Sequence, residues 1–348
     1  MLGNINAIGI VPYRKFITGT LPWFGVASIL MYLTIPLYIF TIAVFGLTSF
    51  LVAKDGFYPK LRRFIDLVAA FSLTIFMFTV ISQCIRAQMI QNRERIQFFN
   101  ILPILTRMET EKWNLFVNFC APEKMTFEEV TDSTAISFTP KSPSTRYTYF
   151  DWEFMNHVVT IDFIKKMDFV KLMTSSDSKV FLKNCYLNVC IFALAARSYF
   201  NNLAYITFPE GCSVFPKDIE VITNKCPKLE NNIKCRMVNK IRELKLTNEE
   251  FLLLNMIFIC NPDVSNMSET GRLLLHCYQN MYSSLLFEYC KITYQKNAPS
   301  RFTDLLSICH VISKTRQEIT NIAILCQVYQ PGMEWKEMLK GAIDYISK

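Results

Sequence analysis

The hydrophobic pattern divides the chain near residue 100. Phe16 to Ala53 contains no charged residue, and a second apolar run extends from Leu67 to Ile85. Both runs reach the roughly 20 residues that a helix needs to cross a bilayer. The pattern therefore predicts a membrane-like segment over residues 1–100, with transmembrane helices at 24–53 and 65–85.

The two apolar runs have two alternative interpretations, a cleaved signal peptide and buried core helices. The runs exceed the apolar region of about 7 to 15 residues in a cleaved signal peptide, so cleavage is not expected. Buried core helices of a soluble protein would need amphipathic neighbours to cover them, and none is nearby. Lys and Arg are more frequent outside the two runs than between them, which favours both ends of the segment in the cytosol.

Beyond residue 100, polar and apolar positions alternate in shorter stretches. Residues 101–150 are expected to hold a first helix and a linker or mobile insertion, because residues 131–146 are rich in Ser, Thr and Pro. From Asp151, the expected N-cap, apolar side chains recur at spacings of three and four, which is typical of a helix. These side chains are Trp152, Met155, Val159, Phe163 and Met167.

The same pattern predicts helices over most of residues 151–348. They are expected at 177–199, 217–246, 248–260, 269–295, 300–329 and 334–346. Thr247 and Glu250 form a capping box before the third of these. Residues 204–216 combine aromatic and β-branched side chains with Pro and Gly, which predicts a short hairpin. The expected fold class is all-α with one minimal β-hairpin.

The net charge of +8 does not indicate a nucleic-acid-binding surface. Residues 1–120 hold 11 Lys and Arg against 5 Asp and Glu, whereas the remaining 228 residues hold 26 against 24. The larger segment is almost neutral, so no broad basic face is expected. None of the 12 cysteines forms a Cys-x-x-Cys pair, which argues against zinc fingers and direct DNA reading.

Motifs of common enzymes are missing from the sequence. It has no glycine-rich nucleotide motif, no Walker A, no G-x-S-x-G and no H-E-x-x-H. His157, His276 and His310 are interpreted as structural or surface residues. Most cysteines fall in apolar runs, where they are expected to be small buried hydrophobes in a reducing compartment. We expect no enzyme, no metal and no cofactor.

The stretch TIDFIKKMDFVKLMTSSDSKVFLKN resembles the signature of nuclear hormone receptor ligand-binding domains, in particular the expanded nematode family. The matching positions are Phe163, Lys165, Phe169, Asp177, Leu182 and Lys183. Two later stretches, LTNEEFLLLNMIFICNPD and APSRFTDLLSI, resemble the eighth and tenth helices of the same family. The resemblance covers about residues 115–348 and implies a three-layer helical sandwich, with the ligand-binding domain at 151–348.

The resemblance also implies a coregulator site edged by lysines. Lys165 and Lys183 would line a groove, and Glu337 on a mobile terminal helix would oppose them. A lysine and a glutamate can hold the two dipole ends of a peptide helix whose leucines fill the groove. Alternatively, these charges are solvated, or the adjacent Lys166 is the operative lysine. The side chains expected to pack the terminal helix on the body are Trp335, Met338 and Leu339.

An apolar pocket for a small lipophilic ligand is implied as well. Such a site binds by burying apolar area, at about 25 cal/mol per Å². The candidate lining residues are Met155, Val159, Cys190, Leu194, Tyr205 and Cys326. The alternative is that they are plain core, with Phe192, Phe208 and Met256 filling the space.

The implied function is a ligand-regulated transcription regulator of the nuclear receptor type, located in the nucleus and lacking its zinc-finger DNA-binding domain. Its expected partners are a coregulator with a Leu-rich helix and a second receptor chain, as a homo- or heterodimer through residues 300–329.

The amino-terminal segment resembles the opening of a nematode or insect multi-span chemoreceptor, although two spans are too few for such a receptor. Two other functions therefore stay open. Residues 24–85 could anchor a non-enzymatic interaction module in a membrane, or the chain could be a gene-model fusion of a chemoreceptor fragment with a receptor domain. A membrane location is expected only if this segment is expressed with the domain.

Overall fold

The computed structural model describes residues 100–329, except 123, 124 and 216, together with isolated helical positions between 39 and 81. Contacts divide the chain into two compact units, Met1–Arg93 and Glu94–Lys348. Most residues of the two predicted transmembrane helices lie outside the described residues, and so does the predicted terminal helix at 334–346. These helices stay predictions.

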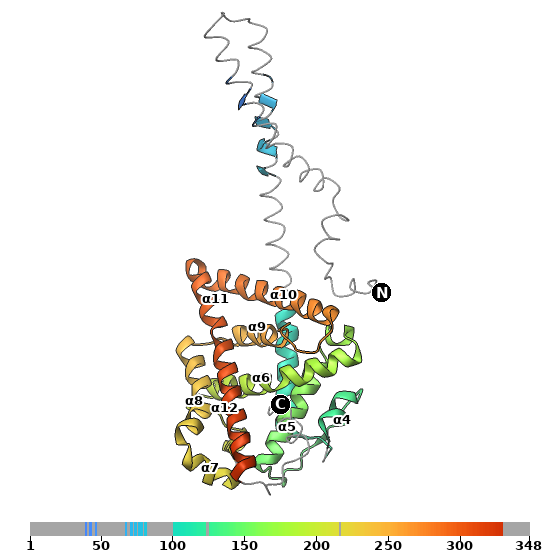
Figure 1. The fold of residues 1–348 in the computed structure, drawn as a ribbon, viewed down its shortest axis with the longest axis vertical. Helices are drawn as coiled ribbons and strands as arrows, with labels where there is room; N and C mark the ends of the chain where they lie inside the picture. Colours follow the sequence, from blue (N-terminus) through green and yellow to red (C-terminus); the bar gives the residue numbers. More distant parts are fainter. Residues whose placement is uncertain are drawn as a thin grey trace, which may run out of the picture. The chain divides into compact units, whose positions relative to one another are not determined.

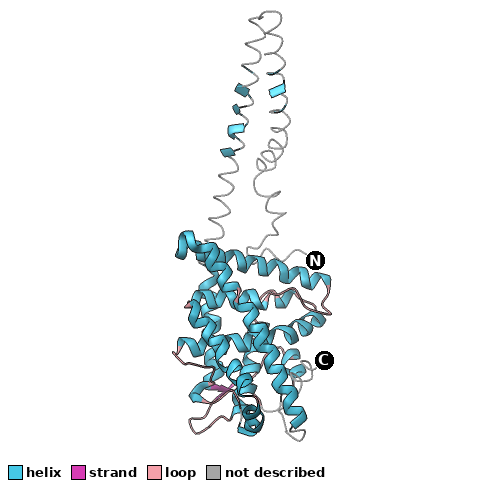
Figure 2. Cartoon of the chain, turned by 60° about the vertical axis from the view of Figure 1, so that its left-hand side comes forward, coloured by secondary structure: helices cyan, strands magenta, loops and turns pink. Residues whose placement is uncertain are grey.

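The second unit is built of helices, as Figures 1 and 2 show. Residues 100–118 are helical. The helices that follow are α4 (Phe127–Asp132), α5 (Tyr149–Lys165), α6 (Ser175–Phe200), α7 (Glu220–Lys225), α8 (Pro227–Leu244), α9 (Asn248–Ile259), α10 (Glu269–Tyr294), α11 (Ala298–Leu306) and α12 (Ile308–Tyr329). Short 3-10 turns are η2 (Val170–Leu172), η3 (Pro209–Gly211), η4 (Lys217–Ile219) and η5 (Gln295–Asn297). The predicted helical class with a minimal sheet is confirmed.

Helix α6 lies at the centre of this unit. It packs against α5, α8, α9 and α12, and α9 packs in turn against α10, so helices stack in the order α5, α6, α9 and α10. Among the described residues, α6 alone has the length and apolarity of a membrane span, but 67% of its most apolar window is buried inside the domain. Its apolarity is therefore that of a central core helix.

Two predicted helices are each divided in the structure. The stretch predicted at 217–246 forms η4, α7 and α8, because Pro227 begins α8 and its neighbour Cys226 has non-helical angles (φ −129°, ψ 54°). Proline disfavours helical angles in the residue before it and suits the first helical position. The stretch predicted at 300–329 is divided at Ser307, whose hydroxyl donates to the carbonyl of Asp304 at 2.5 Å.

The predicted hairpin at 204–216 is reduced to one antiparallel bridge between Thr207 and Ser213. Glu210 and Gly211 between them have positive φ angles of 61° and 74°, and Pro209 supplies no backbone donor, so the pairing cannot extend. The two-stranded sheet lies elsewhere. It pairs β1 (Phe119–Cys120) with β2 (Thr139–Pro140), antiparallel, with Phe119 opposite Pro140.

Helix α5 begins at Tyr149, three residues earlier than predicted. Its N-cap is Thr148, and Asp151 reaches back to the Thr148 backbone to complete a capping box. Asp151 is thus the third helical residue and not the cap. The capping box of Thr247 and Glu250 at the start of α9 is confirmed.

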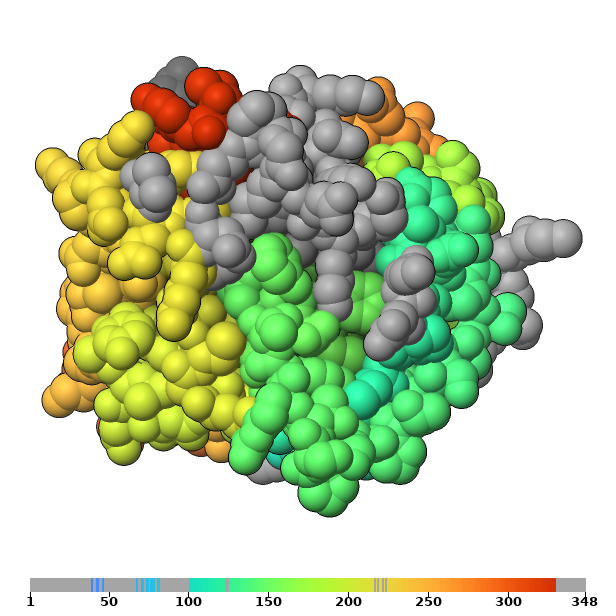
Figure 3. Space-filling view, turned by 90° about the horizontal axis from the view of Figure 1, so that it is seen from below, coloured from blue at the N-terminus to red at the C-terminus, as the bar shows by residue number. Residues whose placement is uncertain are grey.

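The Ser/Thr/Pro-rich stretch before α5 packs on the domain instead of behaving as a free linker. Lys141 bonds Glu210 at 3.1 Å and lies 4.1 Å from the ring centre of Tyr147 and 4.5 Å from that of Trp152. In the view from below, this green segment lies beside the yellow surface of residues that follow α6 (Figure 3). Cation–π contacts and a buried Trp152 hold the stretch in place.

Candidate functional site: an apolar cavity and a lysine-edged surface

A cavity of about 140 Å³ lies between α5, α6 and α12. Its walls are mostly apolar, with Leu187 and Leu194 from α6, Phe208 from the loop after α6, and Ile319 and Ile322 from α12. The size matches an engineered cavity of about 150 Å³ that admits benzene. A ring-sized apolar group therefore fits the space as it stands.

One wall of this cavity is polar. His157 Nε2 lies 2.9 Å from Glu153 Oε1, and both side chains line the cavity together with Tyr149, Asn156 and Thr315. His157 is 1% exposed, and its Nδ1 has no hydrogen-bond partner among the described residues. Burial, followed by the nearby Glu153, raises the pKa of Tyr149. The wall therefore offers hydrogen-bonding groups to whatever fills the cavity.

Sequence reasoning missed this polar wall. His157 was interpreted from the sequence as a structural or surface residue, although Glu153 precedes it by one helical turn and both occupy the same face of α5. The spacing of four residues was the available signal. What the sequence did not supply was the side of α5 that faces the cavity.

Two of the six predicted pocket residues line the cavity, namely Cys190 and Leu194. Tyr205 does not, because the chain leaves α6 after Phe200 and Tyr205 lies 49% exposed on the following turn. Met155 is turned toward β1, where its sulfur accepts from the backbone N–H of Ala121 at 3.2 Å. Val159 lines a separate, smaller cavity beside Phe163.

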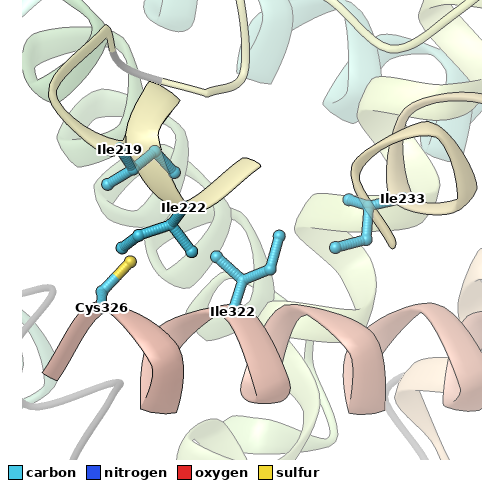
Figure 4. Close-up of a cluster of buried hydrophobic side chains, with 5 residues drawn as sticks. All are labelled: Ile219, Ile222, Ile233, Ile322 and Cys326. Carbon is cyan, nitrogen blue, oxygen red and sulfur yellow. The ribbon is translucent and has the colours of Figure 1, made fainter. Parts of the chain in front are cut away.

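Cys326, the sixth candidate, lies behind the cavity wall. It belongs to a buried cluster with Ile219, Ile222, Ile233 and Ile322 (Figure 4). Three of these isoleucines also line the cavity, whereas Cys326 and Ile222 do not. Burial raises the pKa of the Cys326 thiol to about 11, so this side chain is a neutral core thiol.

The lysine-edged surface lies at the end of α5 and the start of α6. Lys165, the last residue of α5, donates to the backbone carbonyls of Val130 at 2.7 Å and Ser133 at 2.5 Å. These carbonyls end the short helix α4, which lies beside α5 at the edge of the domain (Figure 1). Burial lowers the pKa of Lys165, against the opposing effect of Asp162.

Two lysines of α6 contact the same short helix. Lys183 Nζ lies 3.4 Å from Glu128 and 5.4 Å from the ring centre of Phe127, and Lys179 Nζ lies 2.7 Å from Asp132. Lys165 and Lys183, which the sequence placed at one site, therefore both touch α4. Lys166, the other candidate lysine, pairs with Asp162 one turn earlier at 2.6 Å.

The remaining clamp residue, Glu337, lies outside the described residues, and so do the predicted packing residues of the terminal helix, Trp335, Met338 and Leu339. Their roles stay predictions. Within the described part of the chain, no group of three His, Cys, Asp or Glu side chains could hold a metal. The eleven cysteines described there are free thiols.

Two buried polar joints hold the helices that frame these sites. At the start of α6, Asp177 accepts from the backbone N–H of Ser268 at 2.8 Å and from its hydroxyl at 2.7 Å, which ties α6 to α10. Burial acts to raise the pKa of Asp177, but the hydrogen bonds from Ser268 outweigh it, so the pKa lies below its ordinary value.

The second joint is a buried ion pair. Arg301 of α11 donates to both carboxylate oxygens of Glu250 at 2.8 and 2.5 Å and to the carbonyl of Leu244 at 2.6 Å. Glu250 is fully buried. A single guanidinium therefore connects the end of α8, the start of α9 and α11.

The domain is helical and holds an apolar cavity beside its central helix. Residues 135–329, more than half of the chain, match the family described as the ligand-binding domain of nuclear hormone receptor. The chain belongs to the nuclear hormone receptor family. Members of this family are non-enzymatic regulators in general, and this chain is a regulator of the nuclear receptor type.

Relatives from Caenorhabditis elegans agree with this assignment. The nuclear hormone receptor family member nhr-27 is 35% identical over 270 residues, which cover 78% of this chain and 76% of the relative. Family member nhr-167 is 35% identical over 254 residues, 73% of this chain and 74% of the relative. Family member nhr-9 is 30% identical over 239 residues, 69% and 71% of the two chains. The resemblance to nematode receptors is confirmed.

The amino-terminal segment matches a different family. Residues 3–102 match the family described as tight junction protein, claudin-like, whereas the sequence pattern suggested a chemoreceptor. The match to nhr-27 covers more residues than follow residue 102, so receptor similarity extends into the claudin-like range.

Proposed function

We propose that this chain is a ligand-regulated transcription regulator that acts in the nucleus, takes a small lipophilic molecule into the cavity beside α6, and binds helical coregulator peptides at the lysine-edged surface. The observation that carries the proposal is the cavity itself. It joins apolar walls from α6 and α12 to a polar wall from α5, the composition typical of small-molecule sites.

The polar wall selects the chemistry of the ligand. If the N–H of His157 Nε2 points at Glu153, then Nδ1 is an acceptor, and the carboxylate of Glu153 is an acceptor as well. No Lys or Arg occurs among the described residues that line the cavity. The preferred ligand is therefore neutral and carries an O–H or N–H donor, and a carboxylate would be repelled by Glu153.

Three matched probes of suitable size test this preference. We expect 4-propylphenol to raise the Tm of the full chain more than propylbenzene, and 4-propylbenzoate to raise it least, because binding to the folded state raises stability by mass action. Leu194→Trp should fill the cavity and abolish the shift. The control Leu273→Trp changes an exposed side chain and should keep it. A largest shift with the benzoate, or an unchanged shift in Leu194→Trp, would refute the assignment.

Coregulator binding is tested separately with an amphipathic peptide that carries Leu at positions i, i+3 and i+4. We expect Glu337→Ala to lower the affinity for the peptide, because a clamp glutamate interacts with the positive end of the peptide's helix dipole. Glu334→Ala changes another acid of the predicted terminal helix and serves as control. Equal affinity of Glu337→Ala and the unchanged chain would remove Glu337 from the site.

The claudin-like match at residues 3–102 favours a second candidate, a membrane-anchored receptor-type module. Fractionation of cells that express the full chain separates the two proposals. Carbonate-resistant pelleting supports anchoring through residues 24–85, whereas recovery in soluble nuclear extract supports the nuclear regulator. A transcript across the codons for residues 85–125 tests whether the two segments are made as one chain.

A further inference from the structure

Helix α4 sits on the lysine-edged surface as a bound peptide helix would. Phe127 and Val130, one turn apart, are 4% and 0% exposed, so one face of α4 is buried against the domain. The Phe127 ring lies 5.5 Å from that of Tyr186 on α6. The three-residue spacing of the two buried side chains is that of an amphipathic helix laid into a groove.

The ends of α4 match the charges beneath it. The Lys165 ammonium binds the carbonyls of Val130 and Ser133, which end the helix, and a cation there is favoured by the helix dipole. Glu128 near the start of α4 faces Lys183, and Asp132 near its end faces Lys179. Lys165 and Lys183, the two lysines that edge the proposed coregulator site, therefore both contact α4, a segment of the chain itself.

Helix α4 is also held weakly enough to be displaced. A helix of six residues is far below the roughly 12 to 15 residues that sustain a helix in isolation, so α4 depends on its contacts with the domain in addition to its own capping box at Thr126 and Glu129. Both of its ion pairs are solvent-exposed, with 40% to 63% of each side chain accessible, and exposed pairs contribute little.

We propose that α4 is an intramolecular occupant of the coregulator surface, and that a coregulator helix binds by displacing it. The inference rests on the proposed coregulator function. The partner that fits is an amphipathic helix with apolar side chains at the positions of Phe127 and Val130 and with free C-terminal carbonyls for Lys165. Acidic side chains facing Lys179 and Lys183 would add to its affinity.

The test compares peptide affinity in the full chain with α4 docked and undocked. The probe is a fluorescent peptide helix with Leu at i, i+3 and i+4, read by anisotropy. Phe127→Ala combined with Val130→Ala should bind it about tenfold more tightly if α4 is docked nine-tenths of the time. Val238→Ala removes an equally buried valine from α8, on the other side of the domain (Figure 1), and should leave the affinity unchanged.

Lys165→Met supplies a second signature. In the double variant it should lower the affinity for the peptide strongly, because only the peptide then binds the lysine. In the unchanged chain it should lower this affinity less, because the same substitution also releases α4. Hydrogen exchange gives an independent readout, since saturating peptide should make the amides of residues 127–132 exchange faster.

The outcomes separate this inference from the function on which it rests. Equal, measurable affinities in the unchanged chain and the double variant, or α4 amides that exchange no faster with peptide bound, overturn α4 displacement and leave the coregulator site intact. If the peptide binds neither the unchanged chain nor the double variant, peptide binding at this surface and the displacement of α4 are both overturned. Should the double variant fail to fold, the exchange experiment on the unchanged chain still decides.

Discussion

Two basic side chains hold the carboxyl ends of two helices in this domain, and their surroundings differ. Arg301 binds the carbonyl of Leu244 at the end of α8, and Lys165 binds two carbonyls at the end of α4. Arg301 also holds the fully buried carboxylate of Glu250. Within the described residues, the Lys165 ammonium donates its hydrogen bonds to carbonyls alone.

This difference separates a permanent joint from an exchangeable one. Removal of Arg301 leaves a carboxylate in a region of low dielectric, which costs several kcal/mol. The carbonyls that Lys165 holds can be replaced by those of another helix with no buried charge left unpaired. The same local geometry therefore serves as scaffold in one place and as a docking point in the other.

Arg301→Met should break the permanent joint and produce the largest effect. We expect a loss of about 3 to 5 kcal/mol in the free energy of unfolding, because Glu250 would stay buried without its partner. Urea unfolding of the full chain followed by far-UV circular dichroism measures it. Arg272→Met, on an exposed side chain, should change stability by less than about 0.5 kcal/mol. A second substitution, Glu250→Gln, should recover part of the loss.

Asp177→Asn should weaken the other buried joint by about 1 to 3 kcal/mol, since the donors of Ser268 lose a charged acceptor. The pKa of Asp177 is lowered in the folded chain, so its contribution is complete above the unfolded value of about 4 and is lost as pH falls through the folded value. The stability difference between the two chains should therefore shrink below about pH 4. A difference that stays constant to pH 2 would contradict this linkage, and Asp304→Asn on an exposed side chain is the control.

Val130→Ala should sharpen the comparison, because it acts on α4 alone. If α4 is docked nine-tenths of the time, we expect its amides to exchange about four- to eightfold faster, which corresponds to a local loss of about 1 to 2 kcal/mol. The free energy of global unfolding should stay nearly unchanged. Val238→Ala should do the reverse and lower global stability, since α8 packs on α12 and α6. Equal global losses from the two substitutions would show that α4 unfolds with the core.

Lys179→Ala should have the smallest effect. Its pair with Asp132 is exposed, and such pairs contribute about 0 to 1 kcal/mol and weaken with salt. Exchange of α4 amides should change less than about fivefold at low salt and not at all in about 0.5 M salt. A larger, salt-independent change would mean that the lysine stem packs against α4 and that the charge is secondary.

Much of the fold was readable in the sequence, because helix periodicity and capping chemistry are local. The capping box at Thr247 and the long core helix around Cys190 followed from residues a few positions apart. The break at Pro227 was also local, and its proline was the signal that could have divided the predicted helix. The hairpin was misplaced because β1 and β2 pair across about twenty residues with no turn motif between them.

Some residues of the candidate site could likewise be predicted from the sequence, and others could not. Cys190 and Leu194 line the cavity, as an apolar run on a central helix suggests, whereas Glu153 and His157 escaped notice because periodicity does not tell which face of α5 meets a cavity. Helix α4 escaped as well, since six residues carry too few apolar positions to mark a face.

The sequence by itself determined that residues 151–329 form helices around one central apolar helix, and it determined the family, since both depend on residue types at short, fixed spacings. Only the tertiary structure decided what each charged side chain contacts. Lys165 contacts α4, and Arg301 contacts Glu250 and Leu244, across 32 to 57 positions in the chain. Contacts at such separations depend on how helices pack, and packing is set by the shapes of many side chains at once.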